Sequence, residues 1–434
     1  MNVKTVVDGR LPLLREKRRR PARPSPLRLA DVRGATHLAT QATIEVSHIV
    51  EGVHRSVLGS IGLASGVTPG RTGGVSGLVY RSIRGIAYWV GRGTNGILAT
   101  LEKRLTTDEP GPSSPQREAV LAVLNGIIGD RLAASGSPLA TPMRLLHDGE
   151  PVTQDNPQVL QTGKVSGKIV LLIHGLCMNN RHWQTRNGDP VAGHGAALAA
   201  QLGYTPLYLR YNSGLHVSDN GRELSRVLEQ LLAGWPVAVE EISVVAHSMG
   251  GLIIRSAAQH AEKEGLRWRE RLQNIVFLGT PHHGAPLERG GNLLDAVLGS
   301  TRFTAPFARL GRVRSAGITD LRYGHVREDD WHGHDRFVRR GDARSLLPLP
   351  ENVACFAFAA TIIAKTAAQR GLLADRLVGD GLVPLRSALG EHADPRRSLC
   401  FAKASRAIIY HTGHNALLTD PEVTRKIVRW LTPT

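Results

Sequence analysis

One serine in this chain has the sequence context of a catalytic nucleophile. Residues 242–251 read ISVVAHSMGG, an apolar run that leads into the pentapeptide AHSMG around Ser248. A serine on a sharp turn between a strand and a helix is exposed for attack on a carbonyl carbon, and the turn tolerates only small residues two positions away on either side. Ala246 and Gly250 satisfy that requirement. The segment predicts a nucleophile at Ser248, although small-residue strand–helix turns also occur in nucleotide-binding folds.

A second apolar run ends in residues that could bind a developing oxyanion. Residues 169–179 read IVLLIHGLCMN, so His174, Gly175 and Leu176 follow a predicted strand. A glycine at this place lets the loop pass close to the nucleophile. The backbone N–H groups of Leu176 and Met249 would then stabilise the negative charge of a tetrahedral intermediate. We expect His174 to be a hydrogen-bonded structural residue rather than a base.

A third motif completes a recognisable set. Residues 279–286 read GTPHHGAP and follow another apolar run. With the HGL strand end and the AHSMGG turn, this motif makes roughly residues 160–431 resemble bacterial lipases and the related inositol-deacylase-like esterases of the α/β-hydrolase fold. The resemblance implies that the GTPHHG segment borders the acyl pocket. His282 and His283 could suggest a metal, but no cysteine or carboxylate lies at ligand spacing beside them, and we expect a structural or pocket-lining role.

A serine nucleophile of this kind needs an acid and a base after it in the chain. The base removes the serine proton, the acid fixes the imidazole tautomer, and in α/β-hydrolases the order is serine, acid, histidine. Residues 378–387 read VGDGLVPLRS, which places Asp380 in a glycine-flanked turn. This segment resembles the lipase pattern in which an aspartate precedes Gly-Leu-Val. We therefore predict Asp380 as the acid, with Asp375 as the nearest competitor, expected at the surface.

Two histidines near the end of the chain compete for the role of base. Residues 407–418 read AIIYHTGHNALL, a predicted strand followed by a glycine turn. His414 follows that glycine and matches the final histidine of the resembled family, just before the last helix. His411 ends the strand, where a packed or hydrogen-bonded histidine is expected. The predicted catalytic triad is therefore Ser248, Asp380 and His414.

The elements that must position these residues alternate between strands and helices, which favours a doubly wound, mostly parallel sheet of the α/β-hydrolase type. The predicted strands are 168–173, 206–211, 242–246, 274–278, 353–361 and 398–410, and the predicted helices are 195–201, 222–233, 250–263 and 421–431.

More than 60 residues separate Pro286 from the strand at Val353, far more than a usual connection. We predict a lid or cap insertion at about residues 287–350, whose apolar residues between 293 and 307 could line an acyl tunnel. Residues 329–335, DDWHGHD, alternate potential metal ligands. A cation site there is conceivable, but a solvated loop is the expectation, so no metal is assigned.

The domain organisation follows from composition. Residues 1–29 form a proline-containing tail in which nine Lys and Arg face two acidic residues, and such a segment is predicted to be disordered. Apolar residues at helical spacing predict an N-terminal helical region over residues 30–135, with stripes at 36–61 and 79–101 and a third helix after the linker at 106–115. Residues 140–434 are predicted to form the hydrolase domain, and the helical region 30–135 is expected to pack against it.

The formal net charge of +17 permits contact with anionic surfaces. No nucleic-acid-binding motif accompanies the basic tail, so nucleic acid is not an expected partner. The alternative to a solvated tail is a tether to anionic lipid. Contact of the helical region with a membrane surface is a further alternative, because three arginines alternate with aromatic residues there: Arg81, Arg84 and Arg92 with Tyr80, Tyr88 and Trp89.

Three cysteines, Cys177, Cys355 and Cys400, make a poor disulfide framework and fit a reducing compartment. No signal-peptide pattern and no membrane-spanning run is evident. We therefore predict a cytoplasmic protein, with peripheral membrane association as the alternative.

The functional prediction is a carboxylic-ester hydrolase that works through an acyl-enzyme, needs no cofactor, and accepts an apolar acyl chain in a small-molecule or lipid ester. One alternative is an acyltransferase or thioesterase with the same triad. The other is a membrane-associated binding module with a vestigial hydrolase domain, against which the intact serine, aspartate and histidine argue.

Overall fold

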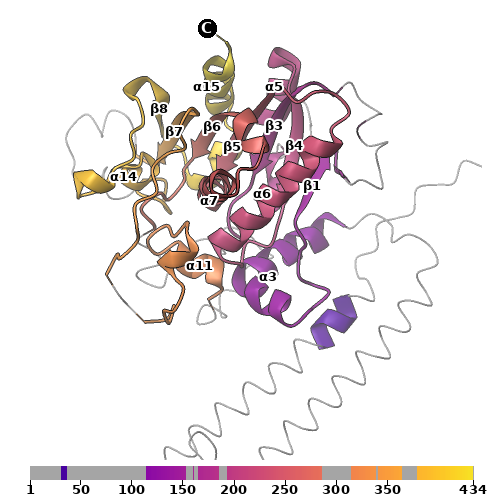
Figure 1. The fold of residues 1–434 in the computed structure, drawn as a ribbon. Helices are drawn as coiled ribbons and strands as arrows, with labels where there is room; N and C mark the ends of the chain where they lie inside the picture. Colours follow the sequence, from indigo (N-terminus) through magenta and orange to yellow (C-terminus); the bar gives the residue numbers. More distant parts are fainter. Residues whose placement is uncertain are drawn as a thin grey trace, which may run out of the picture.

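The structure of the protein is a computed structural model that describes residues 31–36, 114–152, 160, 165–184, 193–285, 314–338, 341–363 and 379–433. A sheet of eight strands in the order β2-β1-β4-β3-β5-β6-β7-β8 forms its centre (Figure 1). The strands are β1 (Arg144–His147), β2 (Glu150–Pro151), β3 (Lys168–Ile173), β4 (Thr205–Arg210), β5 (Glu241–His247), β6 (Leu272–Leu278), β7 (Ala354–Thr361) and β8 (Arg406–Tyr410).

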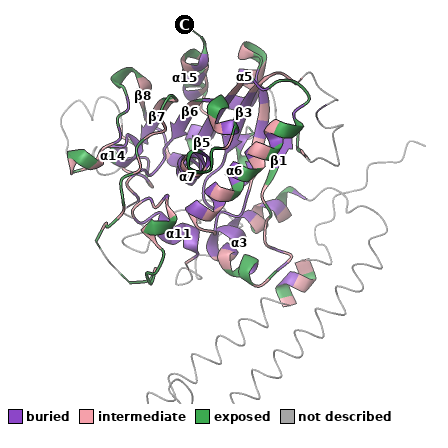
Figure 2. Ribbon diagram, viewed as in Figure 1, coloured by how far each residue is buried: buried purple, intermediate pink, exposed green. Residues whose placement is uncertain are grey.

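Neighbouring strands from β4 to β8 are parallel, whereas β1 runs antiparallel to both β2 and β4. Parallel sheets are covered on both faces, so their strands are apolar throughout rather than alternating with polar residues. β3 has this character, with the sequence KIVLLI and five consecutive buried residues. Figure 2 shows the central strands in the colour of buried residues.

Helices cover both faces of the sheet. Ile169, Leu171 and Ile173 of β3 pack in the cluster that contains α6 (Val217–Gly234) and α7 (Met249–Glu264). Val170 and Leu172 pack on the opposite side, with α5 (His194–Leu202) and α15 (Pro421–Leu431). The doubly wound arrangement predicted from the alternation of elements is thus confirmed. The remaining helices are α3 (Pro115–Ala134), α8 (Trp268–Arg271), α11 (Ala316–Asp320) and α14 (Leu385–Ala388), and the 3-10 turns are η1 (Asn180–Trp183), η4 (Glu328–Asp330), η5 (Pro395–Arg397), η6 (Lys403–Ser405) and η7 (His414–Leu418).

Helix α3 packs directly onto the sheet domain. Ser114 caps its first turn by accepting a hydrogen bond from the Arg117 N–H at 3.2 Å, as serine commonly does at this position. Val123 and Ile127 belong to the same apolar cluster as α6 and α7. Asn179 donates to the Glu118 carbonyl oxygen at 3.2 Å. The helix therefore contributes to the core and is not a separate body.

Two elements differ from the sequence-based expectation. The predicted strand at 398–410 is shorter in the structure, where only β8 pairs with the sheet, because Leu399 and Phe401 are buried against Gly390 instead. The hairpin of β1 and β2 was not predicted. Its turn is formed by Asp148 and Gly149, with φ of 49° and 88°, which is the Asp-Gly signature of a tight hairpin.

Several predictions concern residues outside the described ranges. They include the tail at 1–29, the helical stripe at 79–101, nearly all of the stripe at 36–61, and the apolar part of the insertion between 293 and 307. Within the described ranges, no helix combines the length and the apolarity that a membrane crossing requires.

Candidate active site

Ser248 occupies a strained turn between β5 and α7. Its φ is 53° and its ψ is −124°, a conformation that residues other than glycine rarely adopt and that is found most often at functional sites. The Ser248 N–H donates to the Leu278 carbonyl oxygen at the end of β6, at 2.8 Å. This bond fixes the turn to the neighbouring strand, and the side chain stands at the carboxyl edge of the parallel sheet.

Small residues make the turn possible. A Cβ at Gly250 would lie 2.6 Å from the carbonyl oxygen of Ile173 and 2.8 Å from that of His174. A Cβ at Gly175 would lie 3.0 Å from the Ser248 Cβ. Both glycines therefore allow β3, its following loop and the start of α7 to approach within van der Waals contact of each other.

The two predicted oxyanion donors lie on either side of this contact. Leu176 and Met249 are buried, and within the described residues neither backbone N–H takes part in a hydrogen bond. Met249 is the first residue of α7, where N–H groups have no intrahelical acceptor and the helix dipole is positive. Two free donors beside a serine are the arrangement that an oxyanion would occupy.

Asp380 and His414 form a close buried pair. His414 Nδ1 lies 2.6 Å from Asp380 Oδ2. The other carboxylate oxygen accepts the N–H groups of Leu382 at 3.0 Å and Val383 at 2.8 Å, so its orientation is fixed by the main chain. The His414 N–H also donates to the Asp380 carbonyl oxygen at 3.2 Å. The contact through Nδ1 leaves the Nε2 of His414 for another partner.

Glycine again brings this pair to the sheet edge. Gly279 follows β6 with a φ of 59°, and a Cβ there would lie 3.2 Å from both Asp380 Oδ2 and His414 Cε1. His247, which precedes Ser248, has its Nε2 3.1 Å from the His414 carbonyl oxygen. The three residues predicted as a triad thus lie at one edge of the sheet, on the loops that follow β5, β7 and β8.

Within the described residues the Ser248 hydroxyl makes no hydrogen bond to His414. Catalytic hydrogen bonds are often long before substrate binds and shorten afterwards.

Two other histidines near this edge, His174 and His247, are buried. The His174 ring stacks on Tyr211 with centroids 4.3 Å apart, and the Tyr211 hydroxyl donates to the His174 carbonyl oxygen at 2.7 Å. Burial lowers the pKa of His174 to about 3. Burial and the neighbouring His414 also hold the pKa of His247 well below its usual value. The His411 side chain is exposed rather than packed, and Asp375 lies outside the described residues.

The histidine pair of the GTPHHG motif has structural contacts. The buried His282 ring meets Phe277 edge-on, with centroids 4.8 Å apart. The Nε2 of His283 lies 3.0 Å from the Gly390 carbonyl oxygen, and the His283 N–H donates to Ser387 Oγ at 3.1 Å. These contacts join the loop after β6 to the segment that follows Asp380.

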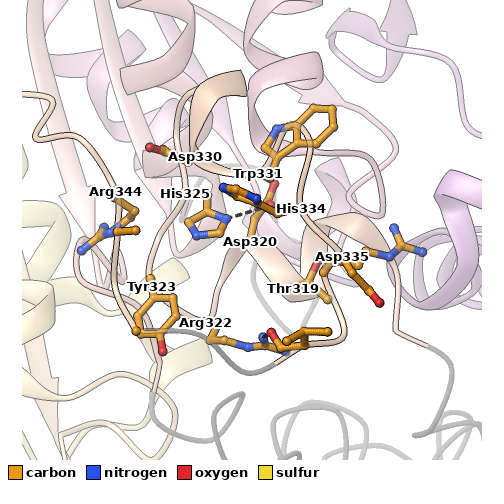
Figure 3. Close-up of a pocket in the computed structure, with 14 residues that line it drawn as sticks. Thr319, Asp320, Arg322, Tyr323, His325, Asp330, Trp331, His334, Asp335 and Arg344 are labelled. Atoms are coloured by element: carbon orange, nitrogen blue, oxygen red, sulfur yellow. Dashed lines mark hydrogen bonds and ion pairs between the residues drawn. The ribbon is translucent and has the colours of Figure 1, made fainter.

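The described part of the insertion surrounds a cavity of its own (Figure 3). Asp320 is buried beneath it and accepts hydrogen bonds from His216 Nδ1 at 3.0 Å and the Val217 N–H at 2.8 Å. Trp331 stacks on His216 with centroids 3.6 Å apart. Asp330 of the DDWHGHD segment accepts main-chain N–H groups. Among the described residues no three His, Cys, Asp or Glu side chains are placed to hold a metal ion.

A mostly parallel sheet with an antiparallel edge, helices on both faces, and a strained serine between β5 and α7 together define the α/β-hydrolase fold. In agreement, residues 164–347 match the family model described as "PGAP1-like alpha/beta domain". The matched segment contains Leu176, Ser248 and Met249, whereas Asp380 and His414 lie beyond it. The match confirms the resemblance that the three sequence motifs indicated.

The chain is also similar, at low sequence identity, to several solved structures. The mature lipase BlEst2 of Bacillus licheniformis is 18% identical, with a TM-score of 0.39 over 61% of this chain and 91% of its own. A gene product of Listeria innocua is 15% identical, with a TM-score of 0.35 over 62% and 94%. Phospholipase PlaB of Legionella pneumophila is 14% identical, with a TM-score of 0.38 over 62% and 60%. No curated protein sequence matches the chain.

Proposed function

We propose that the protein is a serine hydrolase that cleaves carboxylic esters, with Ser248 as nucleophile, His414 as base and Asp380 as the residue that orients the base. The observation that carries the proposal is the combination of a strained serine turn with a buried Asp380–His414 pair, 2.6 Å apart, at the same edge of the sheet. The two free N–H groups of Leu176 and Met249 supply the remaining requirement, a site for an oxyanion.

The proposed reaction has two halves. His414 Nε2 accepts the Ser248 hydroxyl proton as Oγ attacks the ester carbonyl, and the oxyanion that forms accepts hydrogen bonds from Leu176 and Met249. The same proton then passes to the leaving alcohol, which leaves an acyl-serine. In the second half His414 takes a proton from water as the water oxygen attacks the acyl carbonyl carbon. When the tetrahedral intermediate collapses, His414 returns that proton to Ser248 Oγ, the bond between Oγ and the acyl carbon breaks, and a carboxylic acid is released. Asp380 stabilises the imidazolium in both halves.

The substrate we propose is an ester with an apolar acyl chain, in a small molecule or a lipid. Support comes from the resemblance to lipases and from the length of the insertion before β7, since an insertion at that place can cover the serine and shield an acyl chain from water. An alcohol or thiol that replaced water in the second half would make the same triad an acyltransferase, and product analysis separates the two.

The test is labelling by a fluorophosphonate probe, followed by hydrolysis of p-nitrophenyl esters of increasing chain length. We expect the folded protein to be labelled and Ser248→Ala to lose both labelling and activity, by at least about 10³-fold in kcat/KM. Ser256→Ala is the matched control, because Ser256 is a buried serine on the same helix α7. Equal labelling of Ser248→Ala and the folded wild type would refute the assignment.

A further inference from the structure

Cys177, the residue that follows Leu176, has a backbone conformation that residues with a side chain disfavour. Its φ is 59°, in the left-handed region where the Cβ lies too close to the following carbonyl oxygen. Such a conformation persists only where the surrounding structure fixes it. Cys177 is buried, and it contacts both helix α3 and the loop after β4. These two elements therefore fix the chain just after the proposed oxyanion donor.

Helix α3 packs against Cys177 at Gly126. A Cβ at Gly126 would lie 2.2 Å from the Cys177 sulfur and 3.0 Å from both its Cα and its nitrogen. Two residues further along, the Asn179 side chain donates to the Glu118 carbonyl oxygen of the same helix at 3.2 Å. The oxyanion loop, residues 174–179, is therefore in contact with α3 at two places, and the first of these contacts requires a glycine.

Ser213, in the loop after β4, fixes the main chain of Cys177. Its hydroxyl oxygen accepts the Cys177 N–H at 3.1 Å, and both residues are buried. The preceding residue, Asn212, donates to the Gly129 carbonyl oxygen of α3 at 2.8 Å and accepts the Gly214 N–H at 3.0 Å. The loop that carries Ser213 is thus anchored to the same helix, so α3 acts on Cys177 both directly and through Ser213.

Leu176 lies between two fixed residues. On one side, Gly175 is packed so closely on the serine turn that a Cβ there would lie 3.0 Å from the Ser248 Cβ. On the other side, the peptide group that joins Leu176 to Cys177 is held by the Ser213 hydroxyl. The direction of the Leu176 N–H follows from both anchors, and a donor must lie about 3 Å from the oxyanion to stabilise it. A small displacement of Cys177 would therefore turn the donor away from the oxyanion.

We propose that Gly126 of α3 and Ser213 are positioning residues of the oxyanion hole, and that they act through Cys177 on the Leu176 N–H. This role rests on the proposed ester hydrolysis, and it makes that activity depend on a helix outside the matched family segment, which begins at residue 164. Neither residue touches the substrate. Their effect is expected on the rate of the chemical step, because interactions made only with the transition state raise kcat and leave KM unchanged.

The experiment compares kcat and KM for p-nitrophenyl ester hydrolysis by the full-length chain and by two variants, with circular dichroism to check folding. Gly126→Ala places a methyl group against the Cys177 sulfur and should displace the oxyanion loop. We expect its kcat to fall about 10- to 100-fold, with KM within about twofold of wild type. Ser213→Ala removes the acceptor of the Cys177 N–H without adding bulk, and should lower kcat about three- to tenfold.

Each variant has a matched control, in which the same substitution is made at a buried contact elsewhere. Gly221→Ala on α6 would place a Cβ 2.4 Å from the Ser256 Oγ. Ser225→Ala, also on α6, removes the acceptor of the Trp268 Nε1–H at 3.1 Å. Both controls should lose about as much stability as the test variants, while their kcat stays within about twofold of wild type. The comparison separates positioning of the donor from general destabilisation.

A second readout is inhibition by an alkylboronic acid, which binds the serine oxygen as a tetrahedral adduct and places a boron-bound oxygen at the oxyanion site. Its inhibition constant should rise in proportion to the fall in kcat/KM, as for a transition-state analogue. An unchanged inhibition constant in a folded variant with a lowered kcat would place the defect away from the oxyanion hole and overturn the proposal.

A double variant tests whether Gly126 acts through Cys177. Cys177→Ala removes the sulfur that lies nearest to the new methyl group of Gly126→Ala, so the combination should have a kcat at least about threefold above that of Gly126→Ala alone. Cys177→Ala by itself should hydrolyse the ester nearly as fast as the wild type. A double variant as slow as Gly126→Ala would overturn the proposed path through Cys177.

The remaining outcomes separate this role from the activity on which it rests. A wild type whose hydrolysis does not depend on Ser248 overturns the proposed function and the positioning role with it. If hydrolysis does depend on Ser248, the role alone is overturned by folded test variants that keep the wild-type kcat, or by controls that lose as much kcat. If Gly126→Ala does not fold, an equal kcat for Ser213→Ala and Ser225→Ala overturns the role.

Discussion

Two buried polar clusters lie along α7, and they differ in whether their polar groups have hydrogen-bond partners. In the serine edge, formed by Ser248, Asp380 and His414, both oxygens of the only carboxylate have partners within the chain. Around Arg255, in contrast, no described carboxylate forms an ion pair with the guanidinium, and Asp330 acts on its charge only at longer range. Arg255 Nε and His282 Nε2 have no hydrogen-bond partner. The carboxylate of the serine edge is thus fully hydrogen-bonded, whereas the Arg255 cluster keeps two buried N–H groups without acceptors, so burial alone does not show whether a polar cluster is satisfied.

The first prediction removes the contact between Asp380 and His414 in the serine edge. Asp380→Asn replaces the acceptor of the His414 Nδ1–H with an amide that can present a donor instead, which favours the wrong imidazole tautomer. We expect kcat to fall by about 10³- to 10⁴-fold, with ester hydrolysis as the assay and circular dichroism to check folding. Asp394→Asn, on a surface ion pair with Arg396, should keep full activity. An Asp380→Asn variant with near-normal kcat would remove Asp380 from the mechanism.

The second prediction concerns the protonation of His174, a buried residue in the loop after β3. The pKa of buried His174 is lowered from 6.5 to about 3, so below pH 6.5 the unfolded chain binds a proton that the folded chain does not. Stability is therefore complete above pH 6.5 and decreases as the pH falls, by about 2 kcal/mol for this residue between pH 6.5 and 5. Urea titrations at several pH values measure the slope.

His174→Phe should reduce that slope by about 1.4 kcal/mol per pH unit, whatever its effect on stability at pH 7. His332→Phe is the control, because 73% of the His332 side chain is exposed and its loss should leave the slope unchanged. An equal slope for wild type and His174→Phe would show that His174 is protonated alike in both states.

Much of the fold could be predicted because its signals are local. The apolar run 168–173 and the helix 421–431 coincide with β3 and α15 residue for residue. The strained turn at Ser248 is also local, since its small neighbours are adjacent in sequence. The Asp148-Gly149 turn carried an equally local signal, and the β1–β2 hairpin could have been predicted from it. The segment before β8 could not, because Leu399 and Phe401 have the pattern of a strand but are buried by packing on Gly390.

The cluster around Arg255 could not be predicted from the sequence, for a physical reason. Arg255, His282, Arg344 and Arg397 come from four distant segments, and no spacing relates them. In the helical pattern of α7 an arginine next to Ile253 and Ile254 is most simply assigned to a solvated face. Only the packing of α7 against residues 344–347 shows that Arg255 is buried.

Gly126 of α3 packs against Cys177, the residue that follows Leu176. A Cβ there would lie 2.2 Å from the Cys177 sulfur and 3.0 Å from its main chain. Burial raises the pKa of that thiol to about 12, whereas Cys400 is exposed. Alkylation by iodoacetamide is therefore fast at Cys400 and slow at Cys177 for as long as α3 stays docked. The ratio of alkylated Cys177 to alkylated Cys400 therefore measures how often α3 detaches from the rest of the domain.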